Sequence, residues 1–171
     1  IRVDEPVLRV ERDGTRARVI TVKAVYVTDA VIFTAPTMLA NYLIGGEPKA
    51  PFEYSPWLTA NLTLDRLPAT AEPAHWDNVI YDSPALGYVV ATHMSVATHR
   101  SSAVWTHYWA LAGRSPAEAR KWLLAQSWQQ MSEAILNDLS RAHRDIRECV
   151  TRIDVMRLGH AMVRPVPGFL D

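Results

Sequence analysis

The stretch that most constrains this chain runs from residue 26 to residue 36, where a β-branched segment leads into a proline. Its sequence is YVTDAVIFTAP, and residues 27–34 contain enough Val, Ile and Thr to predict a buried strand. Pro36 suits the first position of a helix, where its missing N–H would have no partner in any case. The helix expected next has an apolar stripe made of Met38, Leu39, Tyr42 and Leu43. The segment is therefore expected to run from a strand directly into a helix.

A β-hairpin is predicted before this stretch. Residues 7–11 and 16–22 alternate apolar and polar side chains on either side of Asp13-Gly14. That dipeptide supplies the positive backbone dihedrals of a tight turn. The expected order of elements is therefore hairpin, strand and helix.

This order resembles the flavin-containing amine oxidase and phytoene desaturase-like group of FAD-dependent oxidoreductases. In that group, a Val whose backbone meets the adenine end of FAD precedes a meander, and a later strand ends in an (A/T)-(A/T)-P step. The corresponding segments here are PVLRV at residues 6–10 and DAVIFTAP at residues 29–36. Further similar segments lie at residues 57–64, 76–83, 86–93 and 164–168. The resemblance covers nearly the whole chain.

The resemblance implies a division into two parts and a cofactor. Residues 1–36 would be the remnant of an FAD-binding domain, and residues 37–171 a substrate-binding domain. In the full-length protein, FAD would be contacted by Val7, Thr34, Ala35 and Pro36. Such an enzyme transfers a hydride from a C–N or C–C bond of its substrate to the flavin.

Two FAD-binding features of the group do not occur in this sequence. A dinucleotide fold needs a glycine-rich turn where the pyrophosphate meets a helix N-terminus, and no G-x-G-x-x-G is present. The FAD segment expected after Arg164-Pro-Val-Pro-Gly168 is also missing. We therefore expect a fragment that holds no flavin by itself, is inactive in isolation, and has the remainder of its own polypeptide as a partner.

Composition limits the other classes of function. The 18 basic and 18 acidic residues balance, so nothing favours a nucleic-acid partner. No apolar run approaches the roughly 18 residues of a membrane span. Cys149 is the only cysteine, which rules out an intrachain disulfide and fits a reducing, cytoplasmic location. We expect Cys149 to be a small buried apolar residue.

The remainder of the chain predicts an α+β fold, with an antiparallel or mixed β-sheet covered by a long helix and preceded by the β-meander. Residues 45–56 are expected to form a loop. Strands are then predicted at residues 57–64, 78–81, 87–94, 102–111 and 145–158. A capping box at Ser115-Pro-Ala-Glu118 begins the helix, which continues to about His143. Its buried face would consist of Leu124, Trp128, Met131, Ile135, Leu139 and Ala142.

One strand offers candidate substrate-binding residues. Trp105, His107 and Trp109 share one face of the strand at residues 102–111, and Val104, Thr106 and Tyr108 share the other. In the resembled group, the sheet face turned away from the helix lines the substrate cavity, and we assign Trp105, His107 and Trp109 to it. The alternative is that these aromatic side chains belong to the core.

Other kinds of active site find little support. The six histidines do not show the spacing of a metal site, so no metal is expected. Neither a G-x-S-x-G turn nor a base paired with Cys149 indicates nucleophilic catalysis. Asp82 and Asp154 are expected near a sheet surface, as solvated or hydrogen-bonded residues. No catalytic residue is assigned.

Two functions remain in view. The first is the substrate-domain part of an FAD-dependent oxidoreductase of the amine oxidase type, acting on a small molecule. The second is a self-standing α+β binding or dimerisation module without catalysis. Exposed apolar surface makes a homo-oligomer possible in either case.

Overall fold

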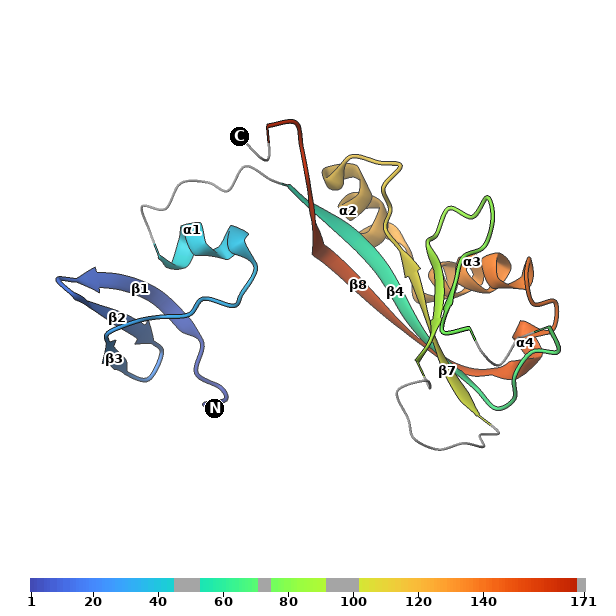
Figure 1. Cartoon of the computed structure of the whole chain (residues 1–171), viewed down its shortest axis with the longest axis horizontal. Helices are drawn as coiled ribbons and strands as arrows, with labels where there is room; N and C mark the ends of the chain where they lie inside the picture. Colours follow the sequence, from blue (N-terminus) through green and yellow to red (C-terminus); the bar gives the residue numbers. More distant parts are fainter. Residues whose placement is uncertain (45–52, 71–74, 92–101, 169–171) are drawn as a thin grey trace. The chain divides into compact units, whose positions relative to one another are not determined.

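The computed structural model describes residues 1–44, 53–70, 75–91 and 102–168. Two compact units divide the chain, one within residues 1–51 together with Gly168 and the other within residues 52–167 (Figure 1). The predicted boundary after Pro36 differs from this division. The short helix that follows Pro36 contacts the first strand, so it belongs to the first unit.

The first unit contains a three-stranded antiparallel meander. Its strands are β1 (Val7–Asp13), β2 (Arg16–Thr21) and β3 (Val25–Thr28), in the order β1-β2-β3. Asp13 pairs with Arg16, and Gly14 between them has a φ of 62°. Glycine adopts this left-handed conformation without steric cost, which confirms the predicted hairpin.

The buried strand predicted at residues 27–34 is wrong. β3 ends at Thr28, and the side chain of Ile32 is 89% exposed. The residues after Thr28 have the composition of a strand, but β-propensity alone does not form one. Without a neighbouring strand, their backbone N–H and C=O groups cannot form the hydrogen bonds of a sheet. The helical turn after Pro36 does form, as η1 (Thr37–Leu39) and α1 (Ala40–Leu43). The backbone N–H of Leu39 donates to the Pro36 carbonyl at 2.8 Å.

The second unit contains a five-stranded antiparallel sheet. Its strands lie in the order β5 (Asp77–Asn78), β6 (Gly87–Val90), β7 (Ala103–Trp109), β4 (Glu53–Leu64) and β8 (Val150–Arg164). Of the loop predicted at residues 45–56, residues 45–52 lie outside the described residues. The last four residues, 53–56, belong to β4. Pro56 is tolerated there because the register of β4 against β8 shifts between Ser55 and Trp57.

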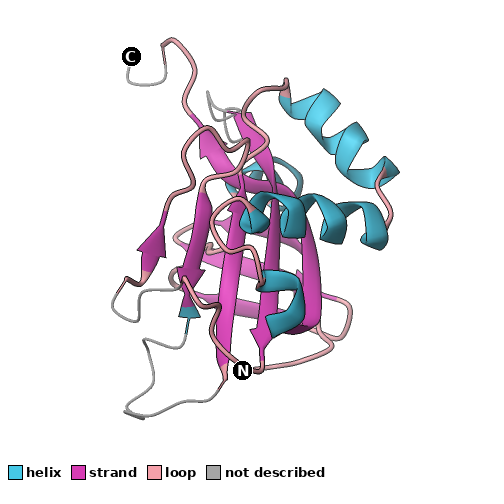
Figure 2. Ribbon diagram, turned by 90° about the vertical axis from the view of Figure 1, so that its right-hand side faces the viewer, coloured by secondary structure: helices cyan, strands magenta, loops and turns pink. Residues whose placement is uncertain are grey.

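The single long helix is also wrong. Figure 2 shows separate helices against the sheet, and they are α2 (Pro116–Ala125), α3 (Trp128–Ser140) and α4 (Ile146–Cys149). α2 begins at the predicted capping box of Ser115 and Glu118. A second capping box begins α3, because Ser127 accepts from the Gln130 N–H and the Gln130 side chain accepts from the Ser127 N–H. This box favours a new helix start over continuation.

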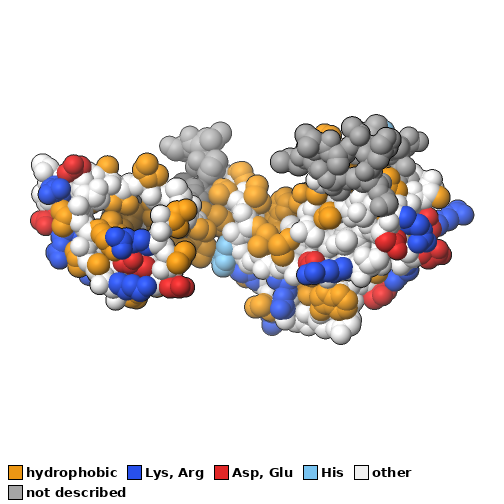
Figure 3. Space-filling model, turned by 90° about the horizontal axis from the view of Figure 1, so that it is seen from below, with side chains coloured by type: hydrophobic (Ala, Val, Ile, Leu, Met, Phe, Trp, Pro, Cys, Tyr) orange, Lys and Arg blue, Asp and Glu red, His pale blue; other side chains and the backbone are white. Residues whose placement is uncertain are grey.

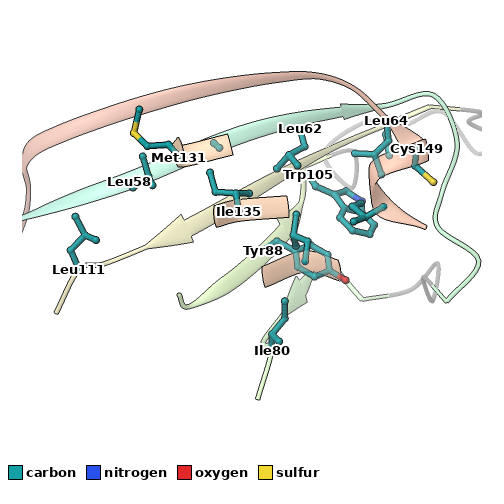
Figure 4. Packing of buried hydrophobic residues seen from close by; sticks show 14 of the residues in the cluster. Leu58, Leu62, Leu64, Ile80, Tyr88, Trp105, Leu111, Met131, Ile135 and Cys149 are labelled. Carbon is teal, nitrogen blue, oxygen red and sulfur yellow. The ribbon is translucent and has the colours of Figure 1, made fainter. Parts of the chain in front are cut away.

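The break changes which side chains are buried. Met131, Ile135 and Leu139 of α3 are buried as predicted, but Leu124 is 75% and Trp128 51% exposed. α2 instead buries Ala119 and Leu123. These helices pack on the apolar face of β4, which carries Leu58, Ala60, Leu62 and Leu64, all fully buried (Figure 4).

The ends of the sheet also differ from expectation. The strand predicted from Asp145 begins only at Val150, because α4 occupies the residues before it, and β8 continues beyond Leu158 to Arg164. Cys149 ends α4 and is fully buried, and burial raises the pKa of its thiol. Gly87 has a φ of 110°, and a Cβ there would overlap the Asn78 carbonyl, so the close pairing of β5 and β6 requires glycine.

Candidate functional site

The sheet of the second unit has one face packed against α2 and α3 and another that none of the described helices of this unit covers. We call the second face the open face. Side chains alternate along each strand, so the residues of β4 that neighbour the buried leucines point to the open face. The register of β4 and β7 then places the alternate residues of β7 beside them. The central residues of the open face are Trp57, Thr59 and Asn61 on β4 and Val104, Thr106 and Tyr108 on β7.

Two pairs of side chains give the open face its chemistry. The rings of Trp57 and Tyr108 meet edge to face, with their centroids 6.5 Å apart. Next to them, the Thr106 hydroxyl donates to Oδ1 of Asn61 at 2.8 Å. The amide nitrogen of Asn61 has no hydrogen-bond partner among the described residues. An aromatic pair therefore lies beside an oriented amide donor, an arrangement that packs apolar groups and holds one acceptor.

Acidic residues of the open face lie on the two edge strands, with Asp77 of β5 at one edge and Asp154 of β8 at the other. Asp154 of β8 lies opposite Asn61, and its Oδ1 accepts from the Arg152 guanidinium at 2.8 Å. Asp154 is thus a hydrogen-bonded strand residue, as expected. Basic and acidic side chains are also interspersed on the surface seen in Figure 3. The centre of the open face is accordingly neutral.

The residues assigned to substrate binding from the sequence lie on the opposite face, so that placement was wrong. Trp105 is 1% and His107 0% exposed, and both lie in the core under the helices. Trp109 packs against Trp122 of α2, with ring centroids 5.5 Å apart. The reason is register: β7 pairs these three residues with Leu62, Ala60 and Leu58, which face the helices.

His107 belongs to a buried polar cluster instead of a cavity wall. Its Nε2 lies 3.2 Å from Oδ2 of Asp138, a carboxylate of α3 that also accepts from the Ser83 hydroxyl at 2.9 Å. Burial raises the pKa of Asp138, but the hydrogen bonds from His107, Ser83 and Arg141 outweigh burial and lower the pKa overall. This cluster fastens α3 to β7 and to the turn after β5.

The residues assigned to FAD contact all lie in the first unit. Val7 begins β1 and is 39% exposed, and Thr34, Ala35 and Pro36 are exposed in the irregular segment before η1. They could offer backbone groups along one edge of a cofactor. However, the only α-helix among the described residues of this unit has four residues, and its N-terminus has no side-chain cap. The described residues of this unit therefore do not fit a complete FAD site.

Two further kinds of site are not seen in the described part of the chain. No group of three or more His, Cys, Asp or Glu side chains there is placed to hold a metal ion. His93 and His99 lie outside the described residues. Among the described helices, none combines the length and the apolar character needed to cross a membrane.

Comparison with known proteins gives structural rather than sequence relatives. No family model matches the sequence, and no curated protein matches it significantly. A protoporphyrinogen oxidase, described as putative, from Exiguobacterium sp. 255-15 matches 98% of this chain with a TM-score of 0.66 at 16% identity. Cyclohexylamine oxidase from Brevibacterium oxydans IH-35A matches 89% at 0.62 and 10% identity, and a redesigned putrescine oxidase matches 88% at 0.62 and 12% identity.

The fold is that of part of an amine-oxidase-like flavoprotein. The chain spans 37%, 33% and 33% of the lengths of these three structures, so it corresponds to about a third of such a protein. Of the order of elements that suggested this group in the sequence, the hairpin and the short helix after Pro36 are found in the structure, and the strand at residues 27–34 is not. At these identities the likeness concerns the fold, and activity has to be argued from the site.

The residues of the open face were overlooked because alternation alone does not tell which face of a strand meets a helix. β4 contained the missing signal. Its Leu58, Ala60, Leu62 and Leu64 mark the helix side, so Asn61 and its neighbours had to be on the other side. The corresponding choice for β7 needs the register of the two strands, which the sequence does not supply.

Proposed function

We propose that this chain supplies the substrate-binding part of an FAD-dependent oxidoreductase of the amine oxidase type, with the open face as one wall of the substrate cavity. The single observation that carries the proposal is the neutral centre of the open face with its aromatic pair and amide donor, in a fold shared with part of an amine oxidase structure. Because the first unit does not fit a complete FAD site, flavin would be held together with further parts of a longer polypeptide. We expect the isolated chain to be inactive.

The side chains of the open face would bind and orient, not transfer protons. Trp57 and Tyr108 would pack against the apolar part of a substrate, and the free amide N–H of Asn61 would donate to an acceptor on it. Thr106 fixes the orientation of the Asn61 amide. The oxidation itself, a hydride transfer from substrate, would depend on the flavin.

Steady-state kinetics of the flavin-loaded longer protein test this proposal. Tyr108→Ala removes half of the aromatic pair on the open face, and we expect KM to rise about tenfold with flavin content unchanged, since a lost aromatic contact of about 1.4 kcal/mol corresponds to that factor. Tyr81→Ala is the matched control, because Tyr81 is 92% exposed and lies in the turn after β5. Equal kinetics of the two variants would contradict the role of the open face.

A further inference from the structure

His143 lies where three segments of the second unit meet. It follows α3, in the turn before α4, and it is 5% exposed. Its Nε2 lies 2.6 Å from the Tyr88 hydroxyl of β6, and its Nδ1 lies 2.8 Å from the Thr70 hydroxyl in the segment after β4. One imidazole thus connects the end of α3 to the sheet and to a loop. We call Thr70, Tyr88 and His143 the His143 cluster.

The hydrogen bonds of the cluster specify which nitrogen carries the proton. The Thr70 hydroxyl donates its only proton to the Ala142 carbonyl at 3.1 Å, so it accepts from Nδ1–H of His143. Nε2 is then an acceptor, and the Tyr88 hydroxyl donates to it. A neutral imidazole satisfies this arrangement completely.

The neighbours of the ring come from every element packed against it. Trp105 of β7 contacts the imidazole with ring centroids 5.0 Å apart. The carboxylate of Asp145 acts electrostatically on the ring, and its Oδ2 accepts from the Ala69 N–H at 2.9 Å. Asp138 and Arg141 lie in the preceding turns of the chain and form an ion pair. Asp138 is also hydrogen-bonded to His107, the residue of β7 that lies opposite Tyr88 of β6.

We propose that the His143 cluster is an acid-sensitive clasp, which holds residues 69–70 and the turn between α3 and α4 against the sheet at neutral pH and releases them in mild acid. A proton added at Nε2 would face the Tyr88 oxygen. The Tyr88 hydroxyl would have to turn its own proton away into a buried environment, where no described group accepts it. The protonated ring would then donate to the Tyr88 oxygen, the Tyr88 proton would be left buried without an acceptor, and the imidazolium charge would itself be buried, so protonation weakens the contact that ties α3 to β6.

The direction of the pH dependence follows from burial. Desolvation lowers the pKa of His143 relative to its ordinary value near 6.5, and the Asp145 charge opposes this only partly. Because the folded-state pKa is below the unfolded-state pKa, the folded state binds fewer protons. The clasp contributes its full stability above about pH 6.5 and loses it as the pH falls below that value. Burial also raises the pKa of Tyr88 to about 12, so Tyr88 remains a donor throughout.

NMR titration and amide hydrogen exchange of this chain test the clasp. Between pH 7.5 and 5, we expect the Ala69 and His143 amides to exchange about five- to tenfold faster than the chemical pH dependence explains, as expected for a lost hydrogen bond. The Leu62 amide in β4 should keep its protection. Constant protection of Ala69 and His143, or loss that is no earlier than that of Leu62, would overturn the proposal.

A conservative variant separates the clasp from a merely structural role. Tyr88→Phe removes the donor to Nε2 and keeps the ring that stacks on Trp105 at a centroid distance of 4.3 Å. The neutral form of His143 then loses its partner, so its pKa should move upward and loosening should begin at a higher pH. Tyr108→Phe on the open face is the matched control and should titrate like the unmodified chain. If Tyr88→Phe leaves the His143 titration unchanged, as Tyr108→Phe should, the clasp is refuted. Should Tyr88→Phe not fold, the hydrogen-exchange experiment on the unmodified chain still tests the clasp.

Discussion

At the scale of single residues, Asp138 joins the helices to the sheet through three hydrogen bonds. It is a nearly buried carboxylate that accepts from His107, Ser83 and Arg141, which come from a strand, a turn and the end of its own helix. Arg141 in addition donates to the carbonyls of Tyr81 and Asp82. One charge therefore fastens α3, β7 and the turn after β5, where Asp82 has a φ of 55°.

Replacing this carboxylate should weaken folding in a pH-dependent manner. We expect Asp138→Asn to lower the free energy of unfolding by about 1–3 kcal/mol at pH 7, because one amide cannot accept all three donors. Since these hydrogen bonds lower the folded-state pKa of Asp138, their contribution is present above the ordinary aspartate pKa and is lost as the pH falls through the folded value. Urea denaturation at pH 7 and near pH 3 measures both effects, and the difference between variant and parent should shrink in acid.

The control for this prediction is Asp65→Asn. The Asp65 side chain is 55% exposed, and its ion pair with Arg66 lies at the surface. Surface pairs contribute little to stability, so this variant should unfold like the parent at both pH values. An equal loss in the two variants at pH 7 would show that Asp138 has no special role.

At the scale of elements, α3 packs a buried face against the sheet. Ile135 is fully buried at its centre, while Leu124 of α2 is 75% exposed. We expect Ile135→Ala to cost about 2–5 kcal/mol of unfolding free energy, since a cavity adds to the lost transfer energy. Leu124→Ala should stay within about 0.5 kcal/mol of the parent. Similar losses in both variants, measured by denaturant unfolding, would restore the single long helix in which both residues share one face.

The elements also show what the sequence could and could not predict. Asp13-Gly14 and the leucines of β4 predicted the hairpin and the central strand, because turn chemistry and alternation are local. The break between α2 and α3 is predictable from the sequence, since Ser127 and Gln130 have the spacing of a capping box. The apolar periodicity across the break favours one continuous helix, and here it is the weaker signal. The sequence could not predict which face of β7 is turned toward the helices, because this depends on pairing with a strand about 45 residues away.

At the scale of the whole molecule, we propose separate tasks for the two units. The first unit would contact the cofactor through Val7 and residues 34–36, and the second would present the open face to substrate. The structures that share this fold are about three times as long as the chain. Activity is therefore a property we propose for a longer flavin-binding polypeptide.

Protection of a cysteine on the open face by substrate is the most direct test of this account. Cys149 is fully buried, so Thr106→Cys adds one thiol at a half-buried position of the open face, and Ala125→Cys adds one at the exposed end of α2. In the flavin-loaded longer protein, with the parent as background, saturating substrate should slow labelling of Thr106→Cys at least tenfold and leave Ala125→Cys unchanged. Equal labelling of Thr106→Cys with and without substrate would contradict the claim that the open face is a wall of the substrate cavity.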